Sequence, residues 1–108
     1  QSKDAQGAYD DLTEALRLSG GQPMRELALY NRGNARVALG DGNGAIEDYT
    51  KSIEVDPSYP DAYANRANLR ERRGDREGAI ADWKKALEVA PQDWPYRQKV
   101  EDRLRKAQ

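Results

Sequence analysis

A stretch of six residues occurs twice in this chain, and the two copies begin 34 residues apart. Residues 44–49 read Gly-Ala-Ile-Glu-Asp-Tyr, and residues 78–83 read Gly-Ala-Ile-Ala-Asp-Trp. The surrounding sequence repeats with the same spacing, so that Gly40-Asp41 returns as Gly74-Asp75. A repeat of this length is one supersecondary unit that cannot bury its own apolar face, and neighbouring units therefore stack into a continuous core. We expect a helical solenoid whose function lies on its surface.

Each repeat is predicted to contain two helices joined by a tight turn. Apolar residues at helical spacing cover residues 25–39, and Gly40-Asp41 then supplies a C-terminal glycine followed by an N-capping aspartate. A second helix is predicted over residues 42–55, where Asp56-Pro57 ends it. The same signals predict the helices of the next repeat, which cover residues 60–73 and 76–89.

The two ends of the chain match parts of a repeat. Residues 4–12 match residues 41–49 at the Asp, Gly, Ala and Asp positions, so we expect a helix over residues 3–18 that is the second helix of a preceding repeat. Ser19 to Pro23 is expected to be a flexible turn. The prediction for residues 1–108 is a single all-α domain of six helices and no strand. Its parts are a half-repeat with its loop, two repeats and a capping helix, over residues 1–25, 26–59, 60–93 and 94–108 (helix 94–107).

Composition excludes several classes of function. The chain has 18 basic and 19 acidic residues, so it lacks the basic excess that sequence-independent nucleic-acid binding needs. It has no cysteine and no histidine, which excludes zinc fingers, thiol nucleophiles and Ser-His-Asp chemistry. No catalytic residue, metal site or cofactor is predicted, and we expect the chain not to be an enzyme.

The sequence shows no membrane or targeting signal. No apolar run approaches the roughly 18 residues that a membrane span needs, and no signal-peptide pattern follows Gln1. Because the first residue is not Met, we expect the sequence to be a piece of a longer protein, without membrane insertion of this fragment.

Small, aromatic and proline residues at fixed positions make the chain resemble the tetratricopeptide repeat family. The small position of the family's first helix corresponds to Gly33 and Ala67, and its turn to Gly40-Asp41 and Gly74-Asp75. The resemblance covers residues 26–93 as two complete repeats. It implies a right-handed superhelix whose first helices line a concave groove for a peptide or a partner helix. The remaining matches are Ala45 and Ala79, Tyr49 and Trp83, Ser52 and Ala86, and Pro57 and Pro91.

The sequence pattern of the repeats is similar to that of repeat proteins from bacteria and plastids of photosynthetic lineages, including photosystem-assembly factors. The similar stretches are Asn-Arg-Gly, Leu-Gly-Asp and Gly-Ala-Ile-x-Asp. This resemblance implies a chaperone-like part of an assembly factor. The residues themselves leave the compartment open, and the resemblance implies an intracellular or chloroplast location.

Two pairs of arginines depart from the family pattern. Arg32 and Arg66 stand where the family commonly has a leucine-like residue, and Arg36 and Arg70 where it commonly has tyrosine. A guanidinium on such a surface needs a carboxylate partner, so for Arg32 and Arg66 we expect structural Arg–Asp pairs that join helices, rather than ligand binding. Arg32 and Arg66 pair with Asp48 and Asp82 if the pair lies within a repeat, and with Asp11 and Asp48 if it bridges repeats.

The family's geometry places one face of the first helices in the groove. Asn31 and Asn34 share a helix face, as do Asn65 and Asn68. An asparagine offers donors and an acceptor, so the four can bracket the backbone of an extended peptide. The alternative is that they are solvated or hold neighbouring helices together. The candidate peptide-binding residues are Tyr30, Asn31, Asn34, Asn65, Asn68, Arg72 and Lys99.

The charge distribution indicates an acidic partner for the C-terminal half of this groove, because basic residues gather over residues 62–76 and in the cap. The alternative for the cap is a solvated face of ion pairs. The two-carboxylate clamp of the family's co-chaperone modules is not favoured. Asn34 and Asn65 fit that clamp and Lys99 stands in for its last base, but Tyr30 and Pro95 occupy its two lysine positions.

Two function hypotheses follow. The first is a protein-interaction scaffold that binds a peptide or partner helix. The second is self-association through an exposed stripe of the first helix. The predicted oligomeric state is a monomer or a weak homodimer. For the core, the residues expected to be buried on the second helices are Ala45, Tyr49, Ile53, Ala79, Trp83 and Leu87.

Overall fold

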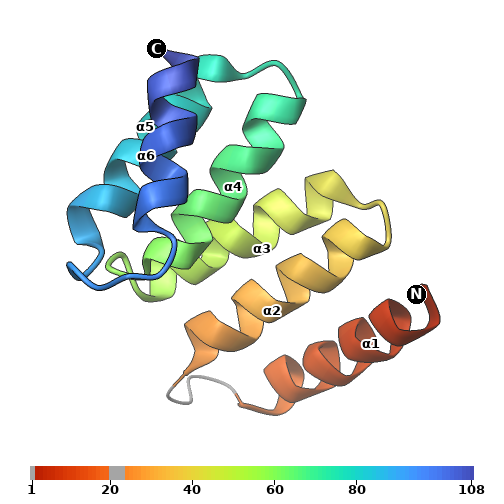
Figure 1. Cartoon of the computed structure of the whole chain (residues 1–108). Coiled ribbons are helices and arrows are strands. Elements are labelled where there is room, and N and C mark those ends of the chain that lie inside the picture. Colours follow the sequence, from red (N-terminus) through yellow and green to blue (C-terminus); the bar gives the residue numbers. More distant parts are fainter. Residues whose placement is uncertain (1, 20–23) are drawn as a thin grey trace. The chain divides into compact units, whose positions relative to one another are not determined.

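The computed structural model describes residues 2–19 and 24–108. These ranges form α-helices joined by turns and contain no strand, as the sequence predicts (Figure 1). The predicted loop of residues 20–23 lies outside the described residues. The helices are α1 (Ser2–Ser19), α2 (Arg25–Ala38), α3 (Gly42–Val55), α4 (Pro60–Arg72), α5 (Arg76–Val89) and α6 (Arg97–Ala107).

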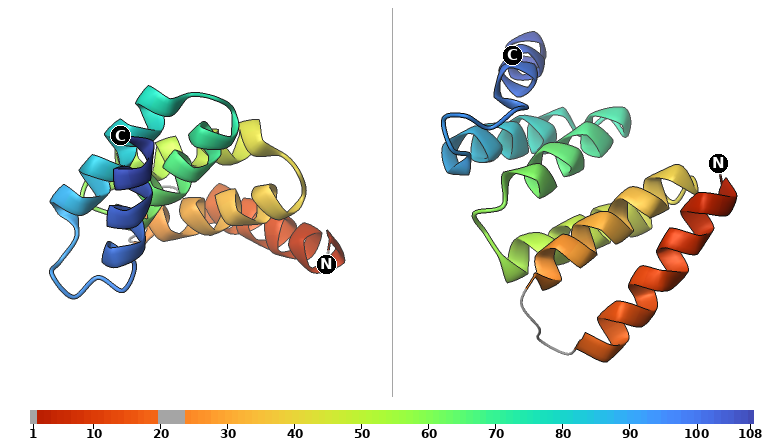
Figure 2. Two further views of the ribbon diagram at one scale, coloured as in Figure 1. Left: turned by 45° about the horizontal axis from the view of Figure 1, so that its top comes forward. Right: turned by 60° about the horizontal axis from the view of Figure 1, so that its bottom comes forward.

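The chain divides into two units. The first unit, Gln1–Pro57, contains α1, α2 and α3. Helix α2 packs against both α1 and α3 and lies between them in Figure 1, and the right-hand view of Figure 2 shows α1 and α2 as neighbours. Gly40 ends α2 with a φ of 82°, a conformation that glycine adopts without strain. Asp41 then caps α3 by accepting a hydrogen bond from the Gly44 amide at 2.9 Å.

The second unit, Ser58–Gln108, contains α4, α5 and α6. Helix α4 packs against α5, and α5 packs against α6. The turn between α4 and α5 repeats the earlier one, because Gly74 has a φ of 87° and Asp75 accepts from the Gly78 amide at 2.9 Å. The same two residues in the same order therefore break the helix in each repeat, as predicted.

Each helix pair buries one aromatic ring of its second helix. Tyr49 and Trp83 are fully buried. A Cβ on Gly33 would stand 2.6 Å from Cε1 of Tyr49, so only glycine lets α2 and α3 approach this closely. The small residues Ala45 and Ala79 are also buried, as predicted.

Ile53 and Leu87, which were predicted to be largely buried together with these residues, are only half-buried. Their spacing from Ala45 and Ala79 is two steps of four residues, and each such step advances about 40° beyond a full helical turn. The buried stripe instead follows steps of three and four. It runs through Ala45, Asp48, Tyr49 and Ser52 in α3, and through Ala79, Asp82, Trp83 and Ala86 in α5.

Helix α6 begins at Arg97, three residues after the predicted start at residue 94. Trp94 precedes Pro95, and a residue before proline is disfavoured in helical conformation. The segment forms two turns instead. In these turns the Trp94 amide donates a hydrogen bond to the Pro91 carbonyl, and the Arg97 amide donates one to the Trp94 carbonyl. The indole N–H of Trp94 donates to Asp61 at 2.7 Å and ties this turn to α4. Among the described helices, none has the length and apolarity of a membrane span.

Candidate functional site

The predicted arginine–aspartate pairs form within each repeat. Arg32 donates to both oxygens of Asp48 at 2.8 and 2.7 Å, and Asp48 is fully buried. Arg66 donates to both oxygens of Asp82, each time at 2.8 Å. The prediction of structural pairs is therefore confirmed, and of its two versions the one within a repeat is correct. These bidentate ion pairs hold the second helix of each repeat against the first.

A second arginine joins each aspartate, and the sequence did not predict this role. Arg70 donates to Asp82 at 3.0 Å. Arg36 lies 3.5 Å from Asp48, and its guanidinium also covers the ring of Tyr9, 5.1 Å from the centroid. Arg36 donates to the Tyr9 hydroxyl at 3.0 Å, and this hydrogen bond lowers the pKa of Tyr9. These side chains are therefore committed to packing between helices.

In the first unit, the predicted groove residues lie on α2, and they differ in burial and in their contacts with α3. Tyr30 is half-buried and packs its ring against Tyr49, with the centroids 5.7 Å apart. The side-chain oxygen of Asn34 accepts a hydrogen bond from the Tyr49 hydroxyl. Asn31 is exposed. For the oxygen of Asn34, the alternative prediction of a contact between neighbouring helices is thus correct.

The corresponding contact is missing in the second unit. Asn68 and Trp83 occupy the positions of Asn34 and Tyr49, but the Asn68 oxygen and the indole N–H of Trp83 are both buried without a hydrogen-bond partner. An indole carries its donor on the ring, whereas tyrosine carries it beyond the ring, so the exchange moves the donor away from the asparagine. Asn65 is half-buried and Arg72 is exposed.

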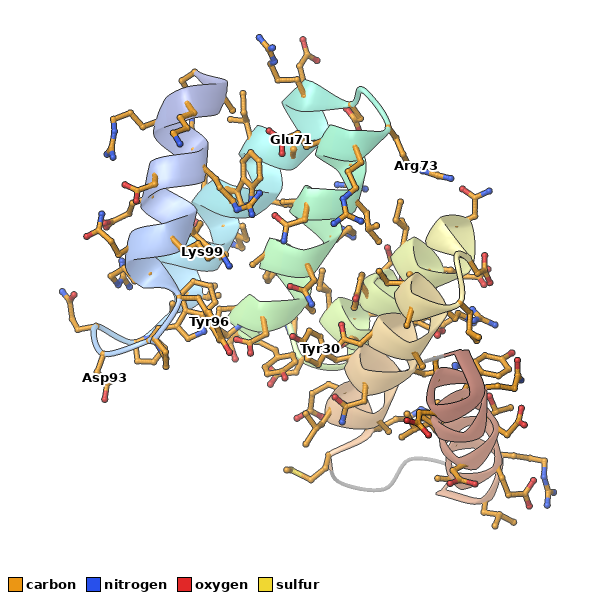
Figure 3. The ribbon with its side chains drawn as sticks, turned by 45° about the vertical axis from the view of Figure 1, so that its right-hand side comes forward. Tyr30, Glu71, Arg73, Asp93, Tyr96 and Lys99 are labelled. Atoms are coloured by element: carbon orange, nitrogen blue, oxygen red, sulfur yellow. The ribbon has the colours of Figure 1, made fainter. Side chains whose placement is uncertain are left out.

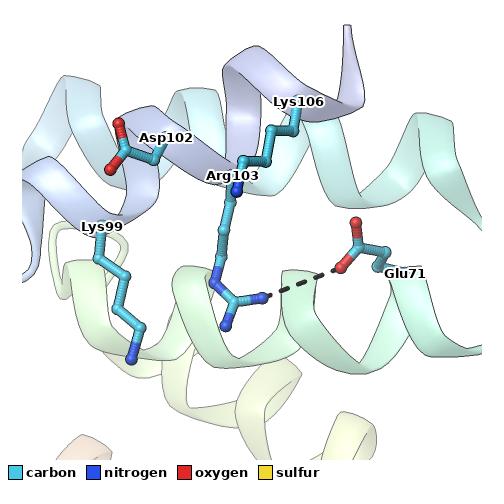
Figure 4. A pocket seen from close by; sticks show the side chains of 5 residues that line it. All are labelled: Glu71, Lys99, Asp102, Arg103 and Lys106. Atoms are coloured by element: carbon cyan, nitrogen blue, oxygen red, sulfur yellow. Dashed lines mark ion pairs between the residues drawn. The ribbon is translucent and has the colours of Figure 1, made fainter.

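A charged pocket of about 400 Å³ lies between the end of α4 and α6. Figure 3 shows Glu71 and Lys99 on these two helices, and Figure 4 shows Lys99 and Arg103 extending from the same side of α6. Arg103 lies 3.9 Å from Glu71. The pocket is lined by Glu71, Lys99, Asp102, Arg103 and Lys106.

The pocket is basic in balance. Asp102 accepts hydrogen bonds from Gln98 and Arg105, and these contacts lower the pKa of its carboxyl group. Asp102 therefore stays ionised and is neutralised by Arg105, and Glu71 has Arg103 beside it. Lys99 and Lys106 add positive charge to this opening.

Lys99 is the one predicted groove residue that lines this pocket, since Asn65, Asn68 and Arg72 are not part of its wall. Sequence reasoning did not select Arg103. The signal was present, because Lys99, Arg103 and Lys106 follow one another at steps of four and three and so share one face of α6.

The first unit has a pocket of about 320 Å³ where α1, α2 and α3 meet, and four of its residues are basic. Arg32 is bound to Asp48, and Arg25 donates to the Leu16 carbonyl at 3.1 Å. Arg17 is paired with Glu14 at 2.6 Å. Most of these charges thus serve contacts within the unit. Its basic residues are Arg17, Arg25, Arg32 and Lys51.

Two protein-family models match this chain. A model described as "TPR repeat" matches residues 33–74, and a model described as "Tetratricopeptide repeat" matches residues 60–93. The TPR domain of OM64 from Arabidopsis is 32% identical, with a TM-score of 0.82 over 96% of this chain and 83% of that one. The chain belongs to the tetratricopeptide repeat (TPR) family. The resemblance read from the sequence is therefore correct at the level of the family, and so is the all-α repeat fold.

Two further proteins are similar to this chain. The DnaJ homolog subfamily C member 7 homolog of Dictyostelium discoideum is 42% identical over 64 residues, which are 58% of this chain. The chain spans 12% of the length of that protein. The first TPR of Spaghetti (RPAP3), solved bound to the HSP90 peptide SRMEEVD, is 25% identical with a TM-score of 0.75, over 94% of this chain and 80% of that one.

Proposed function

We propose that this chain is a protein-interaction module that binds an acidic segment of a partner protein on the α4–α6 surface. The observation that carries the proposal is the basic pocket lined by Lys99, Arg103 and Lys106. Charges placed around an opening steer an oppositely charged segment toward it and favour it over neutral ones. The relative solved with the peptide SRMEEVD supports this class of partner, because that peptide is rich in acidic residues.

The predicted asparagine face extends this site. Asn65 and Asn68 lie on α4, the helix that also supplies Glu71 to the pocket. Because the Asn68 oxygen is buried, we propose that Asn65 contacts the backbone of the bound segment, while the bases of α6 select its charge. A place in a larger assembly factor, a chloroplast location and self-association through α1 remain predictions of the sequence.

An array of heptapeptides with graded numbers of acidic residues, including Ser-Arg-Met-Glu-Glu-Val-Asp, tests this function. Retention of the wild-type chain should rise with the number of acids and fall as salt rises through physiological strength, because exposed charges are screened beyond about 8 Å. The double variant Lys99→Gln/Arg103→Gln should lose this dependence. The matched control, Arg76→Gln/Lys84→Gln, removes two exposed charges from α5 and should keep it.

A dependence on acids that survives in the Lys99→Gln/Arg103→Gln variant would place the binding surface elsewhere on the chain. Equal retention of acidic and amide versions of each peptide by the wild-type chain would remove the charge-based part of the proposal.

A further inference from the structure

The pocket of the first unit has only basic charges on its wall. Its volume is about 320 Å³, and residues of α1, α2 and α3 line it. None of the described residues on its wall is acidic. Besides the bases Arg17, Arg25, Arg32 and Lys51, the wall contains Thr13, Leu16 and Leu29. The pocket therefore favours an anion.

The pocket combines an apolar floor with a charged rim. Leu16 and Leu29 are buried, whereas Arg17 and Lys51 are exposed. Since all four line the pocket, the leucines lie at its floor and the charges at its opening. A ligand that fits both parts carries an anionic group on an apolar stem.

Arg32 presents a fixed donor to this pocket. Its Nε and Nη2 atoms donate to Asp48 at 2.8 and 2.7 Å, which holds the guanidinium in one orientation. The remaining nitrogen, Nη1, lies 3.4 Å from the hydroxyl oxygen of Thr13. This is the long limit of a hydrogen bond, and it is the only one that Nη1 makes within the described chain. Nη1 can therefore donate to an anion in the pocket.

The pocket keeps positive charge although some of its bases are paired. Arg17 and Arg32 have carboxylate partners of their own. Lys51 is exposed and forms no ion pair with any described residue. Its acidic neighbours along α3, Glu47 and Glu54, do not line the pocket. The ammonium group of Lys51 is thus the charge that an anion meets at the opening.

The basic wall does not follow from the repeat. One repeat later, Glu47 stands at the position of Thr13, and Tyr59 stands at the position of Arg25. If packing between helices required these bases, the same residue types would recur at the 34-residue spacing. The set of residues is therefore specific to the first unit.

We propose that this pocket binds the phosphoryl group of a phosphorylated serine or threonine side chain of a partner protein. Such a group carries a charge of about −1.5 to −2 at neutral pH and three acceptor oxygens. These suit the ammonium of Lys51 and the guanidiniums of Arg25 and Arg32. The carbon atoms of the phosphorylated side chain contact Leu16 and Leu29, which an inorganic phosphate ion cannot do. The site lies in the first unit and goes beyond the acidic-segment function proposed for α4 and α6.

An NMR titration of the ¹⁵N-labelled chain in phosphate-free buffer tests the proposal. The probe is the peptide acetyl-Gly-Gly-phosphothreonine-Gly-Gly-amide, and two comparison peptides carry threonine or glutamate at the central position. We expect the phosphopeptide to shift the amides of residues 13–17 and 25–32 saturably, and the threonine peptide to leave them unchanged. The glutamate peptide has less charge and fewer acceptors, so it should bind about fivefold more weakly or worse. Inorganic phosphate should also bind more weakly than the phosphopeptide.

A pair of matched variants makes the test specific. Lys51→Glu should weaken phosphopeptide binding about tenfold, because it replaces an exposed attraction by a repulsion of similar size. Lys85→Glu changes the equivalent position of α5, which does not line the pocket, and should change the affinity less than about twofold. The circular dichroism of Lys51→Glu should match that of the wild-type chain, because Lys51 is exposed.

Wild-type affinity of the Lys51→Glu chain, shifts confined to α4, α5 and α6, or absence of saturable binding would overturn the proposal. Inorganic phosphate that binds as tightly as the phosphopeptide would overturn the choice of a protein side chain as its source. Equal binding of the glutamate peptide would overturn the selectivity for a phosphoryl group. The Lys99→Gln/Arg103→Gln variant should bind the phosphopeptide normally, so this result is independent of the proposed acidic-peptide site.

Discussion

Replacing Asp82 by asparagine should destabilise the chain strongly, because this carboxylate serves two arginines. Asp82 accepts two hydrogen bonds from Arg66 and one from Arg70, at 2.8, 2.8 and 3.0 Å. Its side chain is 5% exposed, and those of Arg66 and Arg70 are 13% and 29% exposed. The substitution keeps the shape of the side chain and removes the charge that Arg66 and Arg70 share, while Arg70 keeps the exposed carboxylate of Asp75 at 3.9 Å.

The expected loss follows from these contacts. Removing one partner of a buried ion pair typically costs about 3–5 kcal/mol. Since Arg70 is partly exposed and can regain water, we expect the lower end, about 3 kcal/mol. Urea denaturation followed by circular dichroism measures it, and for a slope of about 1–3 kcal/mol per M the midpoint should fall by roughly 1–3 M.

Two further variants decide the interpretation. Glu88→Gln removes an exposed acid of the same helix, whose ion pair with Lys85 at 3.4 Å should contribute less than about 0.5 kcal/mol. Replacing Arg66, Arg70 and Asp82 together by leucine should recover most of the loss, because no uncompensated charge then remains. If Asp82→Asn lowers the free energy of unfolding by less than about 1 kcal/mol, the cluster does not hold α4 to α5 in the way argued above.

Three other predictions test the packing and the pocket. Gly33→Ala should destabilise the chain by about 1–2 kcal/mol, because the new Cβ would meet Tyr49 at 2.6 Å. Gly7→Ala should stabilise it by about 0.5–1 kcal/mol, because nothing lies within 4 Å of the new Cβ. Urea midpoints of the two variants that move in the same direction would contradict this. Ala79→Trp should cost about 1–3 kcal/mol or more by overpacking a buried position, and an unchanged thermal melt would show that the position is not a helix contact. The pKa of the Asp102 carboxyl group should lie below the usual range of aspartate, chiefly because of the hydrogen bond from Gln98. Gln98→Ala should therefore raise this pKa toward the usual range in an NMR titration. An unchanged titration midpoint would show that the hydrogen bond is absent in solution.

The helices and their turns could be predicted from the sequence because each boundary depends on local chemistry. A glycine of positive φ and an aspartate that caps the next helix stand at both inter-helix turns of the repeats. The start of α6 could not be placed to the residue, since it depends on Trp94 reaching Asp61 on another helix. The burial of Ile53 was misjudged because a spacing of four was followed further than the helical period allows.

The roles of the polar residues were harder to predict, because a repeated position says nothing about which partner its side chain meets. Asn34 and Asn68 are equivalent in sequence, yet the oxygen of Asn34 accepts from Tyr49, while the oxygen of Asn68 is buried without a hydrogen bond. Arg36 and Arg70 were visible as departures from the family pattern, but their shared carboxylates appear only once the helices are packed.

Positions that are identical in both repeats indicate packing between helices, whereas positions that differ between repeats indicate where a partner is recognised. Arg32 with Arg66 and Asp48 with Asp82 recur at the 34-residue spacing, and these four residues are engaged in packing within a helix pair. Lys99 and Arg103 break the spacing, because the equivalent positions one repeat earlier hold Asn65 and Leu69. Packing within a helix pair is the same task in every repeat and favours the same residues, whereas recognition of a partner happens at one place along the stack. The residues that select the partner are accordingly expected among those that do not repeat, and Lys99 and Arg103 of α6 meet that condition.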